Sequence, residues 1–262
     1  MVEVDFAQLQ QWLAAFFWPF VRLTAFLAAS PLWGHDSIPT QTKIGLAVLL
    51  AVLLGPNLPP LPAVPLVSWT SLGIVIEQTL IGAAMGLTMR VILAVVQAAG
   101  EIIGLQMGLG FASFFAPDTG TNTMILSRLL YMFSLLIFLA LDGHLIVLEI
   151  LADSFTSLPI GQALDLSAGE VLVRHARIIL ASGLLLALPL VAALLIINLA
   201  MGILNRASPQ LTVFSIGFPL TMCVGIVLLM VMMNDLGRFL ESLFGDGLTF
   251  LRQLVASLAL AG

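Results

Sequence analysis

Apolar residues recur in long runs from one end of the chain to the other, separated by short breaks rich in glycine, proline or polar residues. No run shows the strict alternation of apolar and polar positions that is typical of strands, so each run is predicted to be a helix. The predicted fold is therefore all-α. We expect helices at residues 12–32, 43–54, 71–96, 124–141, 145–158, 177–203 and 211–233, and a stretch at 98–109 that either continues the third helix or breaks from it.

The composition points to a membrane-type protein. Of the 262 residues, 60% are hydrophobic and only 9% are charged, and the mean hydropathy is +1.14. Soluble domains carry about 25% charged residues. The helices must therefore cover their sides with lipid or with partner proteins.

Charge and cysteine usage exclude several classes of function. The net charge is −5 and no cluster of Lys and Arg occurs, which disfavours nucleic-acid binding. Glu3 and Asp5 stand where a cleavable signal needs basic residues, so we expect the first apolar stretch to be retained. The single thiol, Cys223, cannot form an internal disulfide or a cysteine metal site, and it is expected to be a small core residue.

Three features differ from an ordinary bilayer protein. Residues 44–54 would rise only about 16 Å as a helix, against a hydrocarbon core of about 30 Å. The charged residues Arg22, Glu77 and Glu101 lie deep in apolar segments, where charge is costly. The connectors carry too few basic residues to read an orientation. We therefore expect many helices to face protein and water rather than lipid.

The internal charges leave two interpretations open. Glu77 and Glu101 can belong to a proton path, as in a transporter. Alternatively they pair with Arg90 or Arg22, or satisfy polar groups where helices meet. The residues alone favour the second interpretation.

Glycines at a spacing of four predict close helix packing. Gly82 and Gly86 form one such pair, and Gly100, Gly104 and Gly108 continue the spacing further along the chain. Small residues four apart on a helix let another backbone approach closely.

A phenylalanine-rich segment follows these glycines. Phe111, Phe114 and Phe115 precede Pro117 and Gly120, which suit a turn, so the three rings are expected on a loop. Such a loop can close a channel, because hydrophobic constrictions exclude water. It can equally be a re-entrant hairpin whose rings fill the core, and the residues alone leave both interpretations open.

A search for catalytic chemistry finds no site. His35, His144 and His175 share no metal-ligand spacing, and no phosphate-binding glycine loop occurs. Asp142-Gly143-His144 is interpreted as a helix break rather than as an acid–base pair. The patterns of intramembrane serine and aspartyl proteases are incomplete. We expect no catalytic residue, no cofactor and no metal, and therefore no enzyme.

The last segment, residues 236–260, is predicted to be a separate amphipathic tail. Its apolar residues recur at helical spacing between charged ones. Two interpretations remain open: a helix packed on its own bundle, or a docking helix for a partner or a membrane surface.

Together, in order, a set of short motifs resembles the FliR family of type III secretion export-gate proteins, on its flagellar rather than its injectisome branch. The resemblance covers essentially the whole chain. The motifs are Trp18-Pro19 with Arg22, Pro31, Ile38-Pro39 with Lys43, Gly100-Glu101-Ile102-Ile103-Gly104-Leu105-Gln106-Met107-Gly108-Leu109, Asp142-Gly143-His144, Leu158-Pro159-Ile160-Gly161, Ala187-Leu188-Pro189, Asn198-Leu199-Ala200-Met201-Gly202-Ile203-Leu204-Asn205-Arg206, Ala207-Ser208-Pro209-Gln210 and Ile216-Gly217-Phe218-Pro219-Leu220.

The resemblance implies an architecture and partners. Members of this family build the export gate with FliP and FliQ, FlhB contacts the outside of that core, and FlhA completes the apparatus. Residues 1–175 would resemble FliP, and residues 176–262 would form a FliQ-like helical hairpin with the amphipathic tail. The resemblance further implies a place in the bacterial inner membrane at the flagellar basal body, partly raised toward the periplasm.

The resemblance also implies a role for the phenylalanine-rich segment, as a plug that closes the pore. The departure here is Ala116-Pro117-Asp118, since relatives often carry the acid before the proline. The implied plug residues are Met107, Gly108, Gly110, Phe111, Phe114, Phe115 and Pro117, with Met107 and Gly110 at the hinge. Helix packing would use Gly82, Gly86, Gly100 and Gly104, and buried polar positions would be Arg22, Glu77, Glu101, Asn198, Asn205 and Arg206.

The leading hypothesis is therefore a passive conduit and gate for unfolded rod, hook, filament and cap proteins. No nucleotide-binding motif occurs, so energy would come from other components. The alternative is a small-solute or proton-coupled transporter that uses Glu77 and Glu101.

Overall fold

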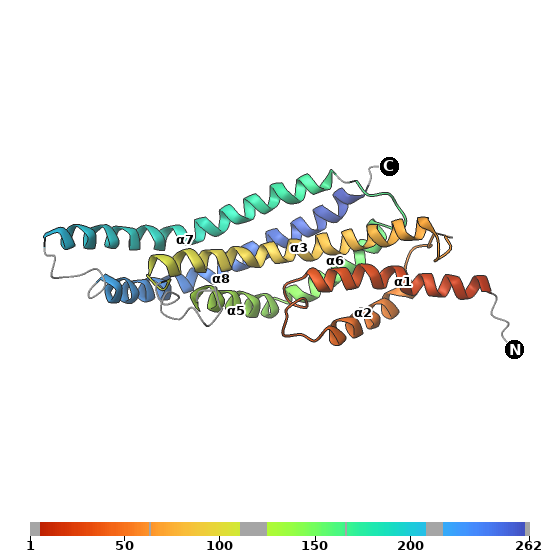
Figure 1. Ribbon diagram of the computed structural model, residues 1–262, viewed down its shortest axis with the longest axis horizontal. Helices are drawn as coiled ribbons and strands as arrows, with labels where there is room; N and C mark the ends of the chain where they lie inside the picture. Colours follow the sequence, from red (N-terminus) through yellow and green to blue (C-terminus); the bar gives the residue numbers. More distant parts are fainter. Residues whose placement is uncertain (1–5, 63, 111–124, 166, 208–216, 260–262) are drawn as a thin grey trace. The chain divides into compact units, whose positions relative to one another are not determined.

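The computed structural model describes residues 6–62, 64–110, 125–165, 167–207 and 217–259. Nearly all of these residues are helical, which confirms the predicted all-α class (Figure 1). The elements are α1 (Phe6–Ala29), α2 (Thr40–Leu54), the short 3-10 helix η1 (Gly55–Asn57), α3 (Trp69–Gln106), α5 (Ile125–Ala140), α6 (Gly143–Ser157), α7 (Ala168–Ala207) and α8 (Phe218–Leu258).

Two expectations about helix boundaries are settled by the structure. The stretch at 98–109 continues α3, which runs unbroken to Gln106. The tail at 236–260 is not a separate helix, because α8 runs from Phe218 to Leu258 without a break. No proline or glycine pair separates Met233 from Leu236, so nothing in the local sequence ends the helix there.

The predicted break at Asp142-Gly143-His144 is confirmed. α5 ends at Ala140 and α6 begins at Gly143. Asp142 between them has a φ of 54°, in the left-handed region that Asp tolerates better than most residues.

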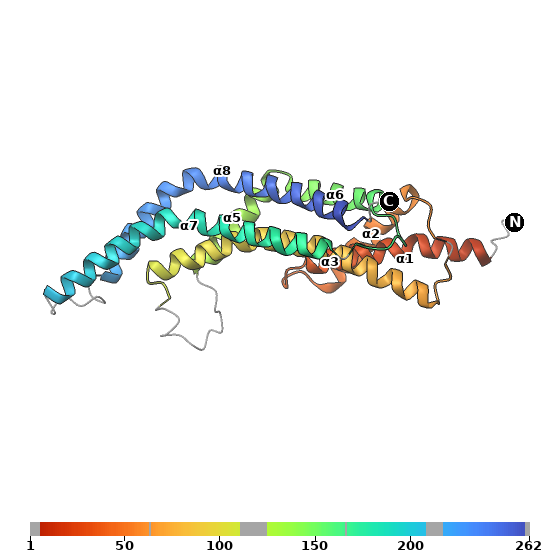
Figure 2. The same cartoon turned by 90° about the horizontal axis from the view of Figure 1, so that it is seen from above.

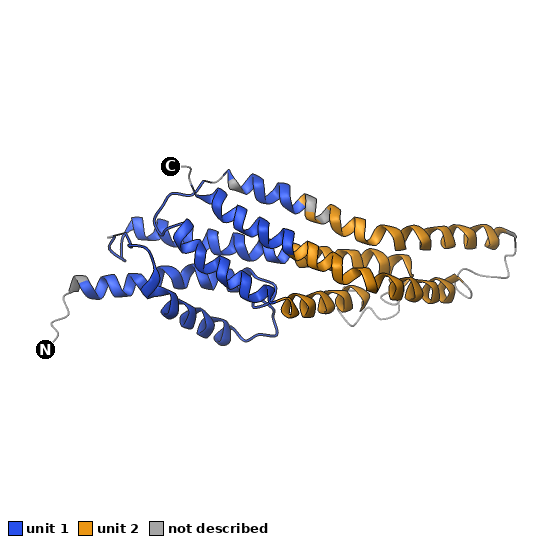
Figure 3. Cartoon of the chain, turned by 180° about the vertical axis from the view of Figure 1, so that it is seen from behind, with its two compact units in different colours: residues 1–91, 142–176, 245–262 blue, residues 92–141, 177–244 orange. Residues whose placement is uncertain are grey.

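The chain divides into two compact units (Figure 3). Unit 1 comprises residues 1–91, 142–176 and 245–262, and unit 2 comprises residues 92–141 and 177–244. The three longest helices, α3, α7 and α8, each contribute residues to both units. We describe each unit by itself.

In unit 1, α1 packs against both α2 and α3. α1 and α2 lie side by side in two perpendicular views (Figures 1 and 2). The contact with α3 is made at Gly82 and Gly86, where an added Cβ would overlap the α1 backbone: it would lie 2.9 Å from Phe26 N at Gly82 and 2.8 Å from Phe26 O at Gly86. The predicted glycine-mediated approach is therefore present at these two positions.

In unit 2, a glycine again sets the distance between two helices. A Cβ at Gly100 would lie 2.6 Å from the Cα of Ser127, so α3 and α5 touch backbone to backbone. The hydroxyl of Ser127 donates to the carbonyl of Gln97 at 2.8 Å across the same contact. Gly104 is buried one turn further along α3. Gly108 does not continue the stripe, because α3 has ended at Gln106.

The C-terminal part of α8 packs on its own chain. In unit 1, Phe250 stacks on His175 of α7 with ring centroids 3.5 Å apart, and an isolated antiparallel bridge joins Leu164 to Ala259. Of the two interpretations of the tail, the structure therefore favours the helix packed on its own bundle. The buried apolar residues of this part are Leu236, Leu240, Leu243, Phe244, Phe250, Leu251, Leu254, Val255 and Leu258.

Four described helices are long and apolar enough to cross a membrane: Gln8–Ala29, Trp69–Gln106, Gly169–Arg206 and Phe218–Leu258. α5 and α6 pass the same test only as a bent pair. At 1.5 Å per residue, the 38 residues of α3 and the 41 of α8 rise about 57 and 62 Å. That is about twice the hydrocarbon thickness of a bilayer.

Large apolar side chains remain exposed on several helices. The predicted core position Cys223 is itself exposed, because the face of α8 that carries it has no described part of the chain against it. On α7 the exposed apolar residues are Val171, Val173, Leu184, Leu185, Leu188, Leu195, Ile196, Leu199, Ile203 and Leu204. On α8 they are Leu220, Ile226, Val227, Met230, Val231 and Met233.

The contact between α1 and α3 gives a testable expectation. Gly82→Ala forces a methyl group into the α1 backbone and should cost about 1–3 kcal/mol of stability. Gly73→Ala, on the same helix with nothing within 4 Å, should not destabilise, since Ala is the better helix former. Melting of the detergent-solubilised protein measures both, and equal melting temperatures for the two variants would contradict the assigned contact.

Candidate functional site

A fully buried arginine connects three helices of unit 1. Arg22 of α1 has no exposed surface. Its Nε donates to Oε1 of Gln78 on α3 at 2.7 Å. Its two terminal nitrogens donate to α6, at 2.8 Å to the carbonyl of Ser154 and at 2.8 Å to the carbonyl of Leu158. The guanidinium also lies 4.3 Å from the ring centroid of Phe155.

This arrangement completes the end of α6. The last carbonyls of a helix lack partners within the helix and carry partial negative charge. Arg22 supplies both the donors and the positive charge at this end, and the fork of its guanidinium reaches two carbonyls at once. Its position on α1 is secured by the glycine contact, since the Cβ that Gly82 lacks would overlap the carbonyl of Arg22.

The pairing of an acidic residue with Arg22, one of the interpretations that the sequence left open, is not present among the described residues. The nitrogens of Arg22 bind Gln78, Ser154 and Leu158, while Oε2 of Glu77 is buried without a hydrogen-bond partner. Glu101 is half-buried, in unit 2. The two carboxylates are 24 positions apart on one helix, a rise of about 36 Å, so they do not share a site.

The second region of interest is the end of α3, where the phenylalanine-rich segment begins. Gly108 has a φ of +82°, which favours glycine, and it follows the last helical residues directly. The amide of Gly108 donates to the carbonyl of Leu105 at 3.0 Å, and the amide of Leu109 donates to that of Gly104 at 2.9 Å. These two bonds define a Schellman motif, a common way to end a helix.

Met107, the residue before this turn, is held against α8. Its side chain is 2% exposed and fills a notch at Gly225, where an added Cβ would lie 2.6, 2.8 and 2.9 Å from Cγ, Cε and Sδ of Met107. One turn earlier on α8, the hydroxyl of Thr221 lies 3.0 Å from the carbonyl of Phe218 and 3.3 Å from that of Met107, and its one proton is shared between these two acceptors. From α7, Nδ2 of Asn198 donates to the carbonyl of Gln106 at 3.4 Å.

The structure therefore places part of the predicted gate. Met107, Gly108 and Gly110 lie at the end of α3, whereas Phe111, Phe114, Phe115 and Pro117 lie outside the described residues. The assignment of a hinge to Met107 and Gly110 stays a prediction.

The predicted buried polar positions separate into two groups. Arg22 is buried, and Glu77, Glu101 and Asn205 are half-buried. Asn198 and Arg206 are exposed, contrary to the expectation, because that face of α7 is uncovered within the single chain.

Some partners were not predictable from the sequence. Nothing in the local pattern marks Gln78 and Ser154 as ligands of Arg22, which they meet across 56 and 132 residues. Thr221 and Gly225 interrupt an apolar helix four residues apart, a weak signal for a contact on one face.

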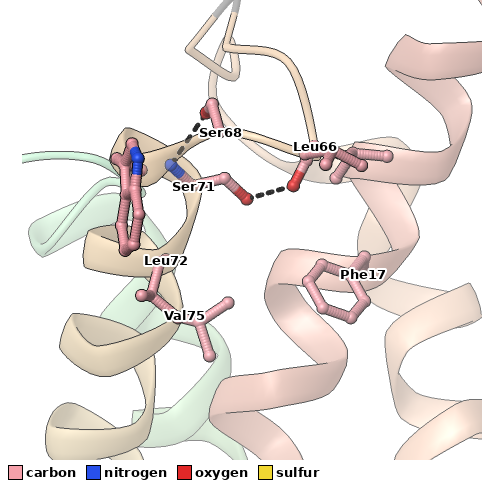
Figure 4. Close-up of a pocket in the computed structure, with 8 residues that line it drawn as sticks. Phe17, Leu66, Ser68, Ser71, Leu72 and Val75 are labelled. Atoms are coloured by element: carbon pink, nitrogen blue, oxygen red, sulfur yellow. Dashed lines mark hydrogen bonds between the residues drawn. The ribbon is translucent and has the colours of Figure 1, made fainter.

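A surface pocket in unit 1 offers no reaction chemistry (Figure 4). It is lined by apolar side chains, among them Phe17, Leu72 and Val75. Its serines are used in the turn that starts α3: Oγ of Ser68 accepts from the amide of Ser71 at 3.1 Å, as in a helix N-cap, and the hydroxyl of Ser71 donates to the carbonyl of Leu66 at 2.6 Å. Among the described residues, His, Cys, Asp and Glu form no group of three that could hold a metal ion.

Replacing the buried arginine tests the first region. Arg22→Met leaves Gln78 and two α6 carbonyls without their partner and should cost about 3–5 kcal/mol of stability. Arg22→Lys keeps the charge but loses the fork, so its loss should be smaller. Arg90→Met, an exposed arginine of α3, should stay within about 0.5 kcal/mol of the parent. Thermal unfolding of the detergent-solubilised protein ranks the three variants by stability. An Arg22→Met variant that melts at the temperature of the parent would contradict the assigned role.

Comparison with known proteins shows the family to which the chain belongs. The sequence profile of the family described as "Bacterial export proteins, family 1" matches residues 13–247. The flagellar biosynthetic protein FliR of Escherichia coli (strain K12) is 42% identical over 261 residues, covering 99% of this chain and 100% of the relative. FliR of Pectobacterium carotovorum subsp. carotovorum is 43% identical over 249 residues, covering 95% of each chain. FliR of Aquifex aeolicus (strain VF5) is 31% identical over 224 residues, covering 84% of this chain and 86% of the relative. The chain therefore belongs to family 1 of the bacterial export proteins, and it is similar over nearly its whole length to flagellar biosynthetic proteins FliR.

Proposed function

We propose that the chain is a core structural and gating subunit of the flagellar type III protein export gate, which passes unfolded flagellar proteins across the membrane. The observation that carries this proposal is the similarity to FliR proteins over 99% of the chain at 42% identity. The residues that the family profile matches, 13–247, include Arg22 and the end of α3.

The uncovered faces of α7 and α8 support a place among other subunits. Residues 178–234 contain a single charged residue, Arg206, and the exposed large apolar side chains of both helices, apart from Val171 and Val173, lie within this stretch. Exposed apolar surface of this extent marks contact with lipid or with other proteins. In the proposed gate the neighbours are FliP and FliQ, with residues 1–175 as the FliP-like part and residues 176–262 as the FliQ-like hairpin.

The lengths of the helices support a position partly outside the bilayer. α3, α7 and α8 are each about twice as long as the hydrocarbon core is thick. We therefore place the chain in the inner membrane at the basal body, with part of each long helix raised toward the periplasm. FlhB on the outside of the core and FlhA complete the proposed apparatus.

The gating part of the proposal concerns the segment after α3. Phe111, Phe114 and Phe115 follow directly on the anchored end of α3, and their rings would close the pore by excluding water. The fixed root at Met107 and Gly108 supports this assignment, because a plug must start from a defined place to occlude a defined path.

The transporter alternative has one observation in its favour, the buried Oε2 of Glu77 without a hydrogen-bond partner. It is weakened by the separation of Glu77 from Glu101 along α3. The two hypotheses differ in what the isolated chain does: a transporter moves solute alone, whereas a gate subunit needs its neighbours.

Co-purification tests the assembly. With tagged FliP and FliQ of the same organism, this chain should co-purify as one complex, and mass determination of that complex should show all three proteins. Expressed alone, the chain should give a low yield and no solute uptake in vesicles, because its apolar faces lack cover. A stable single chain that transports solute without partners would refute the proposed function.

Conductance tests the plug. Replacing Phe111, Phe114 and Phe115 together by Ala should leave assembly intact and make the closed gate conduct ions in planar bilayers, since the rings no longer exclude water. Phe133→Ala, on an exposed face of α5, is the matched control and should stay closed. An assembled triple variant with the conductance of the parent would show that these rings do not form the plug.

A further inference from the structure

One side of α3 in unit 1 carries an exposed apolar stripe between a tryptophan and an arginine. Residues three or four positions apart share a face of a helix. Trp69 is 89% exposed at the start of α3, and Arg90 is exposed 21 positions later, close to the last residue of α3 in unit 1. We call these two ends and the exposed large apolar residues between them the α3 stripe; the residues between are Leu72, Ile76, Leu80 and Leu87.

The α3 stripe is as long as a bilayer is thick. At 1.5 Å per residue, its 21 steps rise about 32 Å, against a hydrocarbon core of about 30 Å. Tryptophan rings favour the headgroup layer, and the long side chain of arginine carries its charge to that layer. The exposed surface also stops at the second end of the stripe, because every residue of α3 from Val91 to Gly104 is buried or half-buried.

The polar residues near the stripe do not interrupt it. Thr79 is exposed beside the stripe, but its hydroxyl donates to the carbonyl of Val75 at 2.7 Å and therefore offers no free donor. Glu77 is the only charged residue between the two ends. It follows Ile76 directly, which turns it about 100° around the helix from that residue, and its Oε2 is buried.

A second exposed tryptophan lies at the height of Trp69. α1 and α3 run in the same direction, because their contacts advance together along both helices, and Arg22 binds Gln78 between them. Trp12 precedes Arg22 by ten residues and Trp69 precedes Gln78 by nine, so both lie about 14–15 Å along the helices from this bond. Trp12 is exposed as well. Two tryptophans at one height are typical of a membrane boundary.

The apolar surface does not extend around the whole of unit 1. α6 exposes Glu149 and Asp153, and Asp153 adjoins Ser154, which Arg22 binds at mid-height of the same zone. Carboxylates at this depth are costly in lipid. The α6 side of unit 1 therefore faces water or protein.

We propose that the α3 stripe contacts the acyl chains of the bilayer, with Trp69 and Trp12 in one headgroup layer and Arg90 in the other. Lipid fits this surface better than a partner helix does, because the two ends match the two headgroup layers in chemistry and in separation. Helix packing alone does not require a tryptophan and an arginine one bilayer thickness apart. Lipid contact here goes beyond the proposed function, and it involves no moving part of the chain.

Spin labels on single cysteines measure this contact. The labelled chain, in a Cys223→Ser background, is co-purified with FliP and FliQ and reconstituted in liposomes. A label at Leu80→Cys, midway along the stripe, should collide with dissolved oxygen far more often than with a water-soluble nickel complex. The ratio of the two collision rates should fall several-fold at Leu72→Cys and at Leu87→Cys, because both positions lie nearer a headgroup layer.

Leu105→Cys is the matched control. Leu105 is another exposed leucine of α3, at 59% against 49% for Leu80, but it lies beyond Arg90 and should lack the high oxygen ratio. The same high ratio at Leu105→Cys, or an equal ratio along the whole stripe, would contradict the proposed boundaries. Rare collisions with both reagents at Leu80→Cys would show that protein covers the stripe, and frequent collisions with nickel would show water. Either result would overturn the proposal.

Two further measurements keep the result decisive. Ile76→Cys, one turn from Leu80 on the same stripe, replaces Leu80→Cys if that variant does not assemble. The co-purification of each sample is recorded separately from its collision rates. A parent chain that fails to bind FliP and FliQ counts against the proposed function, whereas an assembled chain without the oxygen maximum counts against lipid contact alone.

Discussion

The structure depends on one constraint: burying a polar group in this apolar chain costs free energy unless the group finds a hydrogen-bond partner, and neither lipid nor an apolar helix face supplies one. Arg22 meets the constraint through contacts to two other helices, and in doing so it satisfies the end of α6. The end of α3 meets it through Asn198 and Thr221. In both places, binding free carbonyls also holds helices together that are distant in the sequence.

Close backbone contact makes these networks possible. Gly82 and Gly86 bring α3 onto α1 beside Arg22, Gly100 brings it onto α5, and Gly225 gives α8 a notch for Met107. In lipid, the hydrophobic effect does not drive helices together. Van der Waals contact and hydrogen bonding between the closely packed helices hold them instead. The outer faces of α7 and α8 differ from these contacts. They are apolar and exposed, and no buried polar group on them binds another part of the described chain.

The sequence predicts the helices and the glycine contacts well, because both follow from local patterns. The apolar runs predict each described α-helix, although η1 and residues 168–176 of α7 lie outside them, and the spacing of Gly82 and Gly86 predicts the approach that the structure contains. The sequence does not predict that α8 continues through residues 233–236, since an amphipathic stretch after an apolar one resembles two elements. It also does not predict that Gly108 ends α3 or that Arg22 binds α6. Glycine occurs both within helices and at helix C-termini, so its presence at position 108 does not show which of the two applies. Ser154 is 132 residues from Arg22, so no local sequence pattern indicates their contact.

The end of α3 is held in unit 2 by polar and by apolar contacts. Separating this helix end from α7 would break the hydrogen bond from Asn198 to the carbonyl of Gln106, worth about 0.5–1.5 kcal/mol. Separating it from α8 would also expose the buried side chain of Met107, whose burial contributes about 1.5–3 kcal/mol. The end of α3 is therefore held against α7 and α8 by packing as well as by hydrogen bonding.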